Sequence, residues 1–388
     1  MRIFVIADWY LPGWKAGGAL RSLANMVEAC GDELEFYVVT RDRDVTDSKP
    51  YPAITRGEWL QSGNAKVCYL RHLSPISLSR LVEDIHPATT YLNSFFSKRS
   101  VLALVMHRLG CLNGTRIVIS PHGEFSSGAL AIKTLRKRSF LFFVERFNLL
   151  KDCQFHVSTQ QEKADIVNTF SARHSGAFRP ANVLVASDIP VLRDAVTPFP
   201  VKRPGEVRFV FLSRISKMKN LDGAFAFLQG CTGNIALEIF GPEDDPAYAV
   251  RCREAADRLP RNIRLEWHGS LTYEEIWTAF EKAHFLLLPT KGENFGHVIF
   301  EALCAGRPVL LSDKTPWGSV VDAGAGWCLP LAANERWIST LQHCVDMGDP
   351  EYRQCAESAR KFIVEWHRQS NFRQRMIDLF KNEPSTNC

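Results

Sequence analysis

The segment LPTKGENFGHVIFEALCAGRPVLLSD, Leu288–Asp313, contains one complete architectural unit. An apolar strand ends at Pro289, a polar loop follows, a helix begins near Gly296, and another strand starts at Pro308. A strand, a helix and a second strand in this order form a βαβ unit, in which the two strands run parallel. The segment therefore predicts a parallel sheet that is covered by helices.

The same alternation extends outward over most of the chain. The expected strands are Arg2–Ala7, Glu35–Thr40, Ala65–Leu70, Thr89–Leu92, Arg116–Ser120, Gln154–Val157, Asn182–Ala186, Val207–Leu212, Ala236–Phe240, Ile263–Trp267, Phe285–Leu288 and Pro308–Leu311. The expected helices are Ala19–Cys30, Ser77–Ile85, Ser97–Leu109, Gln160–Phe170, Asn220–Leu228, Ala247–Leu259, Tyr273–Lys282, Gly296–Ala305, Ala333–Met347 and Glu351–Phe380, the last with a break. This pattern predicts an α/β protein with two Rossmann-like domains, whose parallel sheets face an interdomain cleft.

One segment interrupts the alternation. Ser187–Glu206 contains four prolines and has neither a helical nor a strand period, so it is interpreted as a linker. The expected domains are residues 1–186 and residues 207–350. Residues 351–388 form a helical segment that could cross back to the N-terminal domain.

The composition is typical of a globular protein without bound metal. The 388 residues include eleven cysteines, none of them in a CxxC pair, which indicates reduced thiols in the cytoplasm and no zinc site. The net charge of +5 is small, and we expect no nucleic-acid partner. The apolar run at the N-terminus stops at Asp8, and no later run approaches the ~20 apolar residues that span a bilayer.

Two carboxylates in the opening segment are candidates for ligand binding. Glu293 lies in the loop before the helix, and Glu301 lies within the helix, about 12 Å further along its axis. That separation exceeds the ~5–10 Å between the paired carboxyls of glycosidases and suits two separate hydrogen-bonding tasks. The amides of Gly296, His297 and Val298 open the helix and could bind a diphosphate. Alternatively, Glu293 caps the helix and Glu301 forms a surface ion pair.

Cations, glycines and a histidine follow other strands. Arg214 and Lys219 come after the strand in FVFLSRISKMKNLDG and could bind phosphate oxygens, although a solvated basic loop is the alternative. Gly17 and Gly18 follow the first strand without forming a GxGxxG fingerprint, so a plain turn is also possible. His122 follows the strand in VISPHGEF, where a hydrogen-bonded loop histidine is the simpler interpretation.

Taken together, these segments resemble the glycosyltransferase family 4 enzymes of GT-B fold. The resemblance is carried by the Glu293-x7-Glu301 motif, the Arg214-x4-Lys219 element, SPHGEF, KAGGALRSL, IFGPEDD (Ile239–Asp245), EWHGSLT (Glu266–Thr272) and SDKTPWG (Ser312–Gly318). It implies a retaining hexosyltransferase that uses a UDP-, GDP- or ADP-sugar, without a metal or another cofactor. The Asp-x-Asp motif of metal-dependent transferases is absent from these segments.

The resemblance also implies that residues 1–186 form the acceptor-side domain and residues 207–350 the nucleotide-sugar-binding domain, and it implies roles for individual residues. Arg214, Lys219, Glu293 and His122 would be catalytic, the two cations by neutralising the donor diphosphate and Glu293 by binding hydroxyls of the transferred sugar. Glu301 would hold the ribose. The other donor-binding residues would be Gly17, Gly18, Gly269, Leu271, Asn294, Phe295, Gly296, His297 and Val298.

A basic and aromatic stretch suggests where the acceptor lies. Residues Ala129–Lys151 contain six basic residues against one acid, interleaved with phenylalanines. Such a stretch is either a domain helix with a solvated basic face or a helix that lies on an anionic membrane. The acceptor is therefore expected to be a saccharide or a lipid-linked saccharide of surface polysaccharide or lipopolysaccharide synthesis. We expect a cytoplasmic protein that could be peripheral on the inner membrane face.

Other classes of protein share parts of this pattern. A nucleotide-sugar 2-epimerase needs the same diphosphate site, and a non-catalytic sugar-nucleotide-binding protein would bind donor without turnover. A binding-only protein has no need for the complete set of Glu293, Glu301, Arg214 and Lys219. A nicotinamide dehydrogenase ranks last because the glycine fingerprint is missing.

Overall fold

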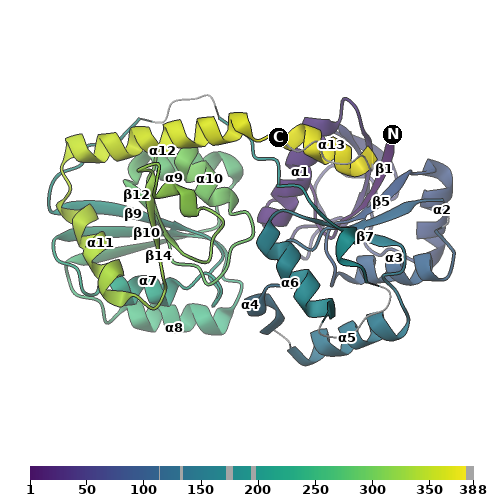
Figure 1. The fold of residues 1–388 in the computed structure, drawn as a ribbon, viewed down its shortest axis with the longest axis horizontal. Coiled ribbons are helices and arrows are strands. Elements are labelled where there is room, and N and C mark those ends of the chain that lie inside the picture. The colour runs from purple at the N-terminus through teal and green to yellow at the C-terminus, as the bar shows by residue number, and fades with distance from the viewer. Residues whose placement is uncertain (113, 132–133, 172–177, 194–197, 382–388) are drawn as a thin grey trace. The chain divides into compact units, whose positions relative to one another are not determined.

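The structure is a computed structural model that describes residues 1–112, 114–131, 134–171, 178–193 and 198–381. The chain divides into two compact units (Figure 1). The first contains Met1–Pro190 and Asn371–Cys388, and the second contains Val191–Ser370. Among the described residues, no helix is long and apolar enough to cross a membrane.

The first unit is built on an eight-stranded sheet of order β3-β4-β2-β1-β5-β6-β7-β8. The strands are β1 (Arg2–Ile6), β2 (Glu35–Thr40), β3 (Trp59–Ser62), β4 (Ala65–Tyr69), β5 (Thr89–Leu92), β6 (Arg116–Ile119), β7 (Cys153–Val157) and β8 (Val183–Val185). Every pairing is parallel except that of β3 with β4. Strand β3 is an edge strand that the sequence analysis missed.

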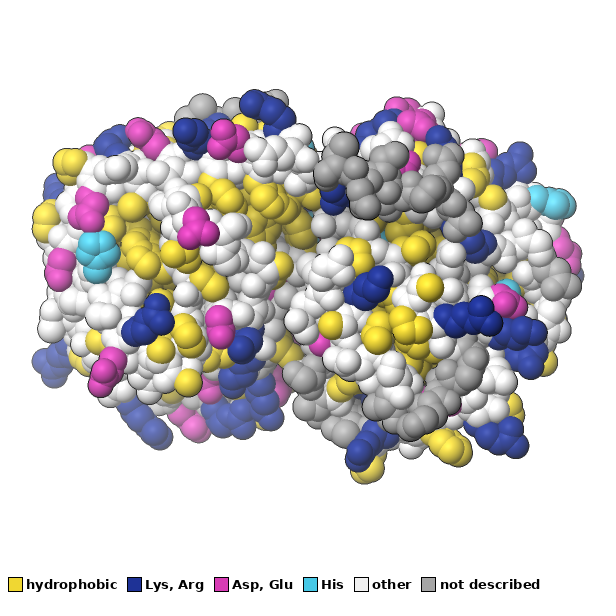
Figure 2. All heavy atoms as spheres, in the orientation of Figure 1, with side chains coloured by type: hydrophobic (Ala, Val, Ile, Leu, Met, Phe, Trp, Pro, Cys, Tyr) yellow, Lys and Arg dark blue, Asp and Glu magenta, His cyan; other side chains and the backbone are white. Residues whose placement is uncertain are grey.

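Helices cover this sheet. They are α1 (Gly18–Cys30), α2 (Pro75–Ile85), α3 (Lys98–Arg108), α4 (Ser127–Ala131), α5 (Thr134–Arg146), α6 (Gln160–Ser171) and α13 (Phe372–Lys381), with a short 3-10 helix at Pro180–Asn182. The basic stretch forms two helices, α4 and α5, and Lys133 lies outside the described residues. Yellow hydrophobic and dark-blue basic side chains lie next to each other in the region where Figure 1 labels α5 (Figure 2).

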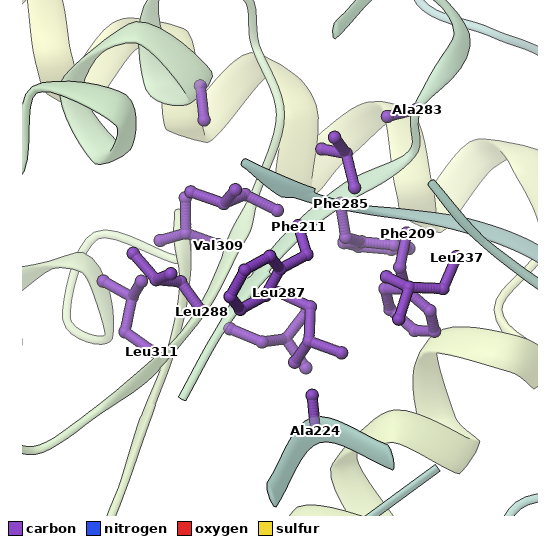
Figure 3. Packing of buried hydrophobic residues seen from close by; sticks show 14 of the residues in the cluster. Phe209, Phe211, Ala224, Leu237, Ala283, Phe285, Leu287, Leu288, Val309 and Leu311 are labelled. Carbon is purple, nitrogen blue, oxygen red and sulfur yellow. The ribbon is translucent and has the colours of Figure 1, made fainter. Parts of the chain in front are cut away.

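The second unit has a six-stranded parallel sheet of order β11-β10-β9-β12-β13-β14. Its strands are β9 (Glu206–Leu212), β10 (Asn234–Phe240), β11 (Ile263–Gly269), β12 (Phe285–Leu288), β13 (Val309–Ser312) and β14 (Gly326–Leu329). Phe209, Phe211, Leu287 and Val309 lie within the buried core around the central strands (Figure 3). Strand β14 was not predicted. It needs glycine at Gly326, where a Cβ would lie 2.2 Å from the Val309 carbonyl oxygen.

Helices lie on both faces of the second sheet, with α7 and α8 on one face and α9, α10 and α12 on the other (Figure 1). The helices are α7 (Leu221–Leu228), α8 (Pro246–Ala256), α9 (Tyr273–Lys282), α10 (His297–Cys304), α11 (Asn334–Asp346) and α12 (Asp349–Gln369), with a short 3-10 helix at Gly318–Val320. The predicted break in the last helix is confirmed, because α12 ends at Gln369 and α13 begins at Phe372.

The segments that join the units have defined contacts within each unit. Of the expected linker, residues from Val191 onward belong to the second unit. There the buried Lys202 ammonium donates to the carbonyls of Val345 and Met347, each at 2.9 Å. Helix α13 belongs to the first unit and packs on α1. Its Arg373 guanidinium donates to both carboxylate oxygens of Asp32 at 2.6 Å.

Candidate functional site

The sheet order of the second unit places the candidate residues at one edge. From β9 the chain proceeds outward to β10 and β11, then returns to β12 on the other side of β9. In an open parallel sheet, ligands bind at such a switch point, beyond the carboxyl ends of the two strands. The loop after β9 carries Arg214 and Lys219, and the loop after β12 carries Glu293.

The two loops are joined by an ion pair. The Lys219 ammonium lies 2.5 Å from Glu293 Oε2, and their side chains are only 11% and 14% exposed. The Asn220 amide donates to the Pro289 carbonyl at 2.9 Å, and the Lys291 amide donates to the Met218 carbonyl at 2.7 Å. These bonds hold Lys219 in a fixed position. Lys219 is therefore not a solvated loop lysine, and Glu293 does more than cap the following helix.

Arg214 is arranged differently. Its side chain is about half exposed, and its Nη1 donates to Asp244 Oδ2 at 2.6 Å from the loop after β10. Because an exposed ion pair contributes only about 0–1 kcal/mol, the guanidinium can exchange this carboxylate for phosphate oxygens at little cost. Asp244 was not identified as a functional residue, although the sequence analysis quoted the segment that contains it.

Helix α10 begins directly behind the ion pair. Gly296 has φ 82° and ψ 63°, and a Cβ there would lie 2.9 Å from the Glu293 side chain. The first-turn amides of His297 and Val298 therefore follow a position that only glycine fills without strain. Glu301 lies in the same helix and is 6% exposed, so the alternative of a surface ion pair is wrong.

Asn294 and Phe295 complete the loop before Gly296. Phe295 is 5% exposed, and its ring lies 5.7 Å from the ring of Trp317, centroid to centroid. The Trp317 indole donates to the Phe295 carbonyl at 2.6 Å. The Phe295 side chain is therefore part of the core.

Glycines join the ends of β9, β10 and β11. The Gly241 amide donates to the Gly269 carbonyl at 2.7 Å, and the Ser213 amide donates to the Phe240 carbonyl at 2.9 Å. Gly269 has φ 74° and ends β11, and Leu271 follows after one further residue, so both candidates lie at the same sheet edge as Arg214.

The first unit presents its candidates at the corresponding edge. Gly17 precedes α1 with φ 70° and ψ −136°, a conformation that favours glycine, and Gly18 begins the helix. His122 follows β6, and its Nε2 lies 2.7 Å from Asn93 Oδ1. Asn93 follows β5 and donates to the Ala19 carbonyl at 3.3 Å. Asn93 thus joins the segments that follow β1, β5 and β6, a role that was not predicted from the sequence.

Two carboxylates fix the His122 loop. Glu124 Oε2 accepts from the Phe95 amide at 2.7 Å and Oε1 accepts from Ser94 at 2.7 Å, while Glu162 accepts from the amide of Gly123 at 2.5 Å. Burial raises the pKa of Glu124, and the hydrogen bonds to Ser94, Phe95 and Phe96 oppose that rise. These contacts make His122 a positioned loop histidine.

Asp188 adds a titrating group to the first unit. Burial raises its pKa from 3.8 to about 6, opposed by hydrogen bonds to Ser22 and Ser158. The raised pKa means that the folded chain binds this proton more tightly than the unfolded chain. Stability from this group is therefore fully present below pH 3.8 and is lost as the pH rises to about 6.

The Asp188→Asn variant should lack this loss. Relative to wild type, the free energy of unfolding of this variant is expected to rise by about 2 kcal/mol between pH 4 and pH 7, because only the wild type loses stability as Asp188 ionises. Urea unfolding at both pH values measures the difference, with the exposed Asp257→Asn as the control. An Asp188→Asn variant whose pH dependence matches wild type would contradict the assignment.

Comparisons with known proteins agree with this architecture. Residues 193–362 match the sequence model of the family described as "Glycosyl transferases group 1". The second unit thus carries the sequence pattern of that family. In the parts of the chain that the structure describes, no group of three or more His, Cys, Asp or Glu side chains could hold a metal ion.

Solved structures extend the likeness to the whole chain. A sucrose-phosphate synthase from Thermosynechococcus elongatus matches with a TM-score of 0.71 and 15% identity, over 98% of both chains. WaaG, a glycosyltransferase involved in lipopolysaccharide biosynthesis, matches with 0.65 and 14%, over 99% of this chain and 100% of its own. Anabaena Alr3699/HepE in complex with UDP-glucose matches with 0.71 and 14%, over 98% and 100%. No curated protein matches the sequence. The chain therefore has the GT-B fold.

Proposed function

We propose that this protein is a retaining glycosyltransferase that moves a hexose-type sugar from a nucleotide-diphosphate donor to a saccharide or lipid-linked saccharide. The observation that carries the proposal is the Lys219–Glu293 pair at the switch point, with Arg214 on the same sheet edge and the first turn of α10 behind Glu293. In this arrangement, two cations and the helix-end amides can bind a diphosphate. The Glu293 carboxylate can bind sugar hydroxyls.

The chemistry of such a site is charge stabilisation. As the glycosidic bond breaks, negative charge grows on the leaving diphosphate, and fixed cations lower the energy of that state. Lys219 is already held by Glu293 and needs little reorganisation, whereas Arg214 leaves Asp244 to bind phosphate. We propose that Glu301 holds the ribose and that Gly269 and Leu271 contact the base. His122, Gly17 and Gly18 would bind sugar and phosphate groups from the first unit, and no metal is required.

Support for the acceptor comes from the compared structures. WaaG and the galactosyltransferase WaaB act in lipopolysaccharide synthesis by their names, and a trehalose-phosphate synthase was solved with glucose-6-phosphate. We propose an acceptor in surface polysaccharide or lipopolysaccharide synthesis, at the inner face of the cytoplasmic membrane.

A thermal-shift screen of UDP-, GDP- and ADP-sugars tests donor binding. A matching donor at a hundred times its Kd should stabilise the protein by about 2.7 kcal/mol. Arg214→Ala is expected to raise the Kd about tenfold or more, because a hydrogen bond to a charged group is lost. Lys217 is an exposed cation three residues further on, and Lys217→Ala should leave the Kd unchanged.

Three outcomes would contradict the proposal. If no sugar nucleotide stabilises the protein, or if Arg214→Ala and Lys217→Ala change the Kd equally, the proposed donor site is wrong. Stabilisation without transfer to any acceptor would indicate a binding protein. Isomerisation of the donor sugar without acceptor would indicate an epimerase.

A further inference from the structure

Four exposed apolar side chains of the first unit gather around α5. Leu135, Phe142, Phe143 and Phe147 are 81%, 65%, 39% and 51% exposed, and the last three are the phenylalanines that rank as exposed among the described residues. On the opposite side of the helix, Leu141 and Val144 are buried in the core. The helix thus has a second apolar face that is exposed among the described residues of its domain.

The end of α3 extends this face. The Arg108 guanidinium donates to the Phe147 carbonyl at 3.2 Å, which places Arg108 and the 72%-exposed Leu109 beside α5. The sequence analysis had confined the surface to Ala129–Lys151. We define the α5 surface as the five apolar residues Leu109, Leu135, Phe142, Phe143 and Phe147 and the four exposed arginines Arg108, Arg136, Arg138 and Arg146.

The charge of the α5 surface is positive. Its four arginines are exposed, whereas the nearby acid Glu145 is half-buried, with its Oε1 shielded from solvent. Lys137 is not counted in this surface, because its ammonium donates to the Ala129 carbonyl at 2.6 Å and lies 4.8 Å from the centre of the Phe96 ring. The α5 surface therefore combines guanidinium groups with phenylalanine and leucine side chains.

This combination selects among partners. A second copy of the chain, docked symmetrically on the same face, would bring arginines against arginines. Nucleic acid would pair with the arginines but would leave aliphatic and aromatic side chains against phosphates. At an anionic bilayer, the apolar side chains enter the boundary between head groups and acyl chains while the arginines bind lipid phosphates.

We propose that the α5 surface binds an anionic lipid bilayer, with α5 lying along the membrane plane. The surface contains none of the residues assigned to the donor, so the proposal does not depend on the donor site. Together with the proposed function, it would place the acceptor-side unit at the membrane and favour an acceptor that is carried by a lipid.

Co-sedimentation with vesicles tests the proposal on the full-length protein. We expect binding to vesicles of phosphatidylcholine mixed with phosphatidylglycerol, weaker binding to phosphatidylcholine alone, and loss of the difference at high salt. Arg136→Ser with Arg138→Ser should lower the partition coefficient on anionic vesicles about 25-fold, which corresponds to about 1 kcal/mol for each arginine. Arg258→Ser with Arg261→Ser removes two exposed arginines of the second unit and should leave it unchanged.

A second pair of variants tests the apolar contribution. Phe142→Ser with Phe143→Ser should abolish binding to both kinds of vesicle, whereas Val250→Ser with Val321→Ser, at exposed positions of the second unit, should not. Unchanged melting temperatures would show that all variants fold.

Binding that does not depend on vesicle charge, or that survives both α5 variants, would overturn the proposal. So would a wild-type dimer in sedimentation velocity that Phe142→Ser with Phe143→Ser dissociates, because the surface would then be a protein interface. Donor-induced thermal shifts would be unaffected by any of these outcomes.

Discussion

Replacing Lys219 with methionine is expected to lower the rate of nucleoside-diphosphate release about a hundredfold to a thousandfold. Lys219 Nζ lies 2.5 Å from Glu293 Oε2 in a largely buried pair, so its charge is fixed before substrate arrives. A cation held in this way stabilises the leaving diphosphate without reorganisation, and its removal leaves that charge uncompensated in the transition state. The rate of donor consumption with acceptor, measured by coupled detection of the free nucleotide, checks the prediction.

A second consequence separates catalysis from stability. The single variant leaves Glu293 without its cation, and an isolated carboxylate at a buried site lowers the free energy of unfolding. The double variant Lys219→Met with Glu293→Gln removes the stranded charge and should recover stability but not turnover. Lys217→Met, which changes an exposed lysine of the same loop, should affect neither. Recovery of turnover in the double variant would show that the pair is purely structural.

The regular elements could be predicted because their residues carry local signals. Runs such as Phe285–Leu288 are apolar throughout, as expected for strands buried on both faces, and the loops between runs contain glycine, proline or polar residues. Strands β3 and β14 carried no such signal. Each has four residues, and WLQS and GWCL contain polar or half-exposed positions at a sheet edge. Their pairing depends on tertiary contact with β4 and β13.

The residues of the site could be predicted from the sequence, but the contacts between them could not. Arg214, Lys219 and Glu293 were singled out because each follows a strand, and parallel strands bring such residues to one edge. The bond from Lys219 to Glu293 spans 74 positions, and that from Arg214 to Asp244 spans 30. No periodicity within a single sequence reports which of two loop residues will meet. Asn93 was missed for the same reason, since its amide matters only once His122 lies beside it.

Gly241 shows how the fold positions the site. It follows β10 with φ 140°, in a region that residues with a side chain rarely adopt. A Cβ at this position would lie 1.9 Å from the Ser213 carbonyl oxygen, a backbone atom that cannot move without displacing β9. The same residue donates to the Gly269 carbonyl, so the ends of β9, β10 and β11 meet at this glycine. Arg214 follows Ser213 directly, which links the position of its guanidinium to this close approach.

We therefore expect Gly241→Ala to lower the free energy of unfolding of the second unit by more than about 4 kcal/mol, since it combines a backbone clash with a disfavoured φ. Gly205→Ala is the matched control. It has φ 79° but no atom within 4 Å of the added Cβ, so only the conformational cost of about 1 kcal/mol applies. Guanidinium unfolding monitored by tryptophan fluorescence compares the two. Equal losses would mean that the φ angle alone requires glycine, and that β9 can shift away from β10 without harm to the loop that carries Arg214.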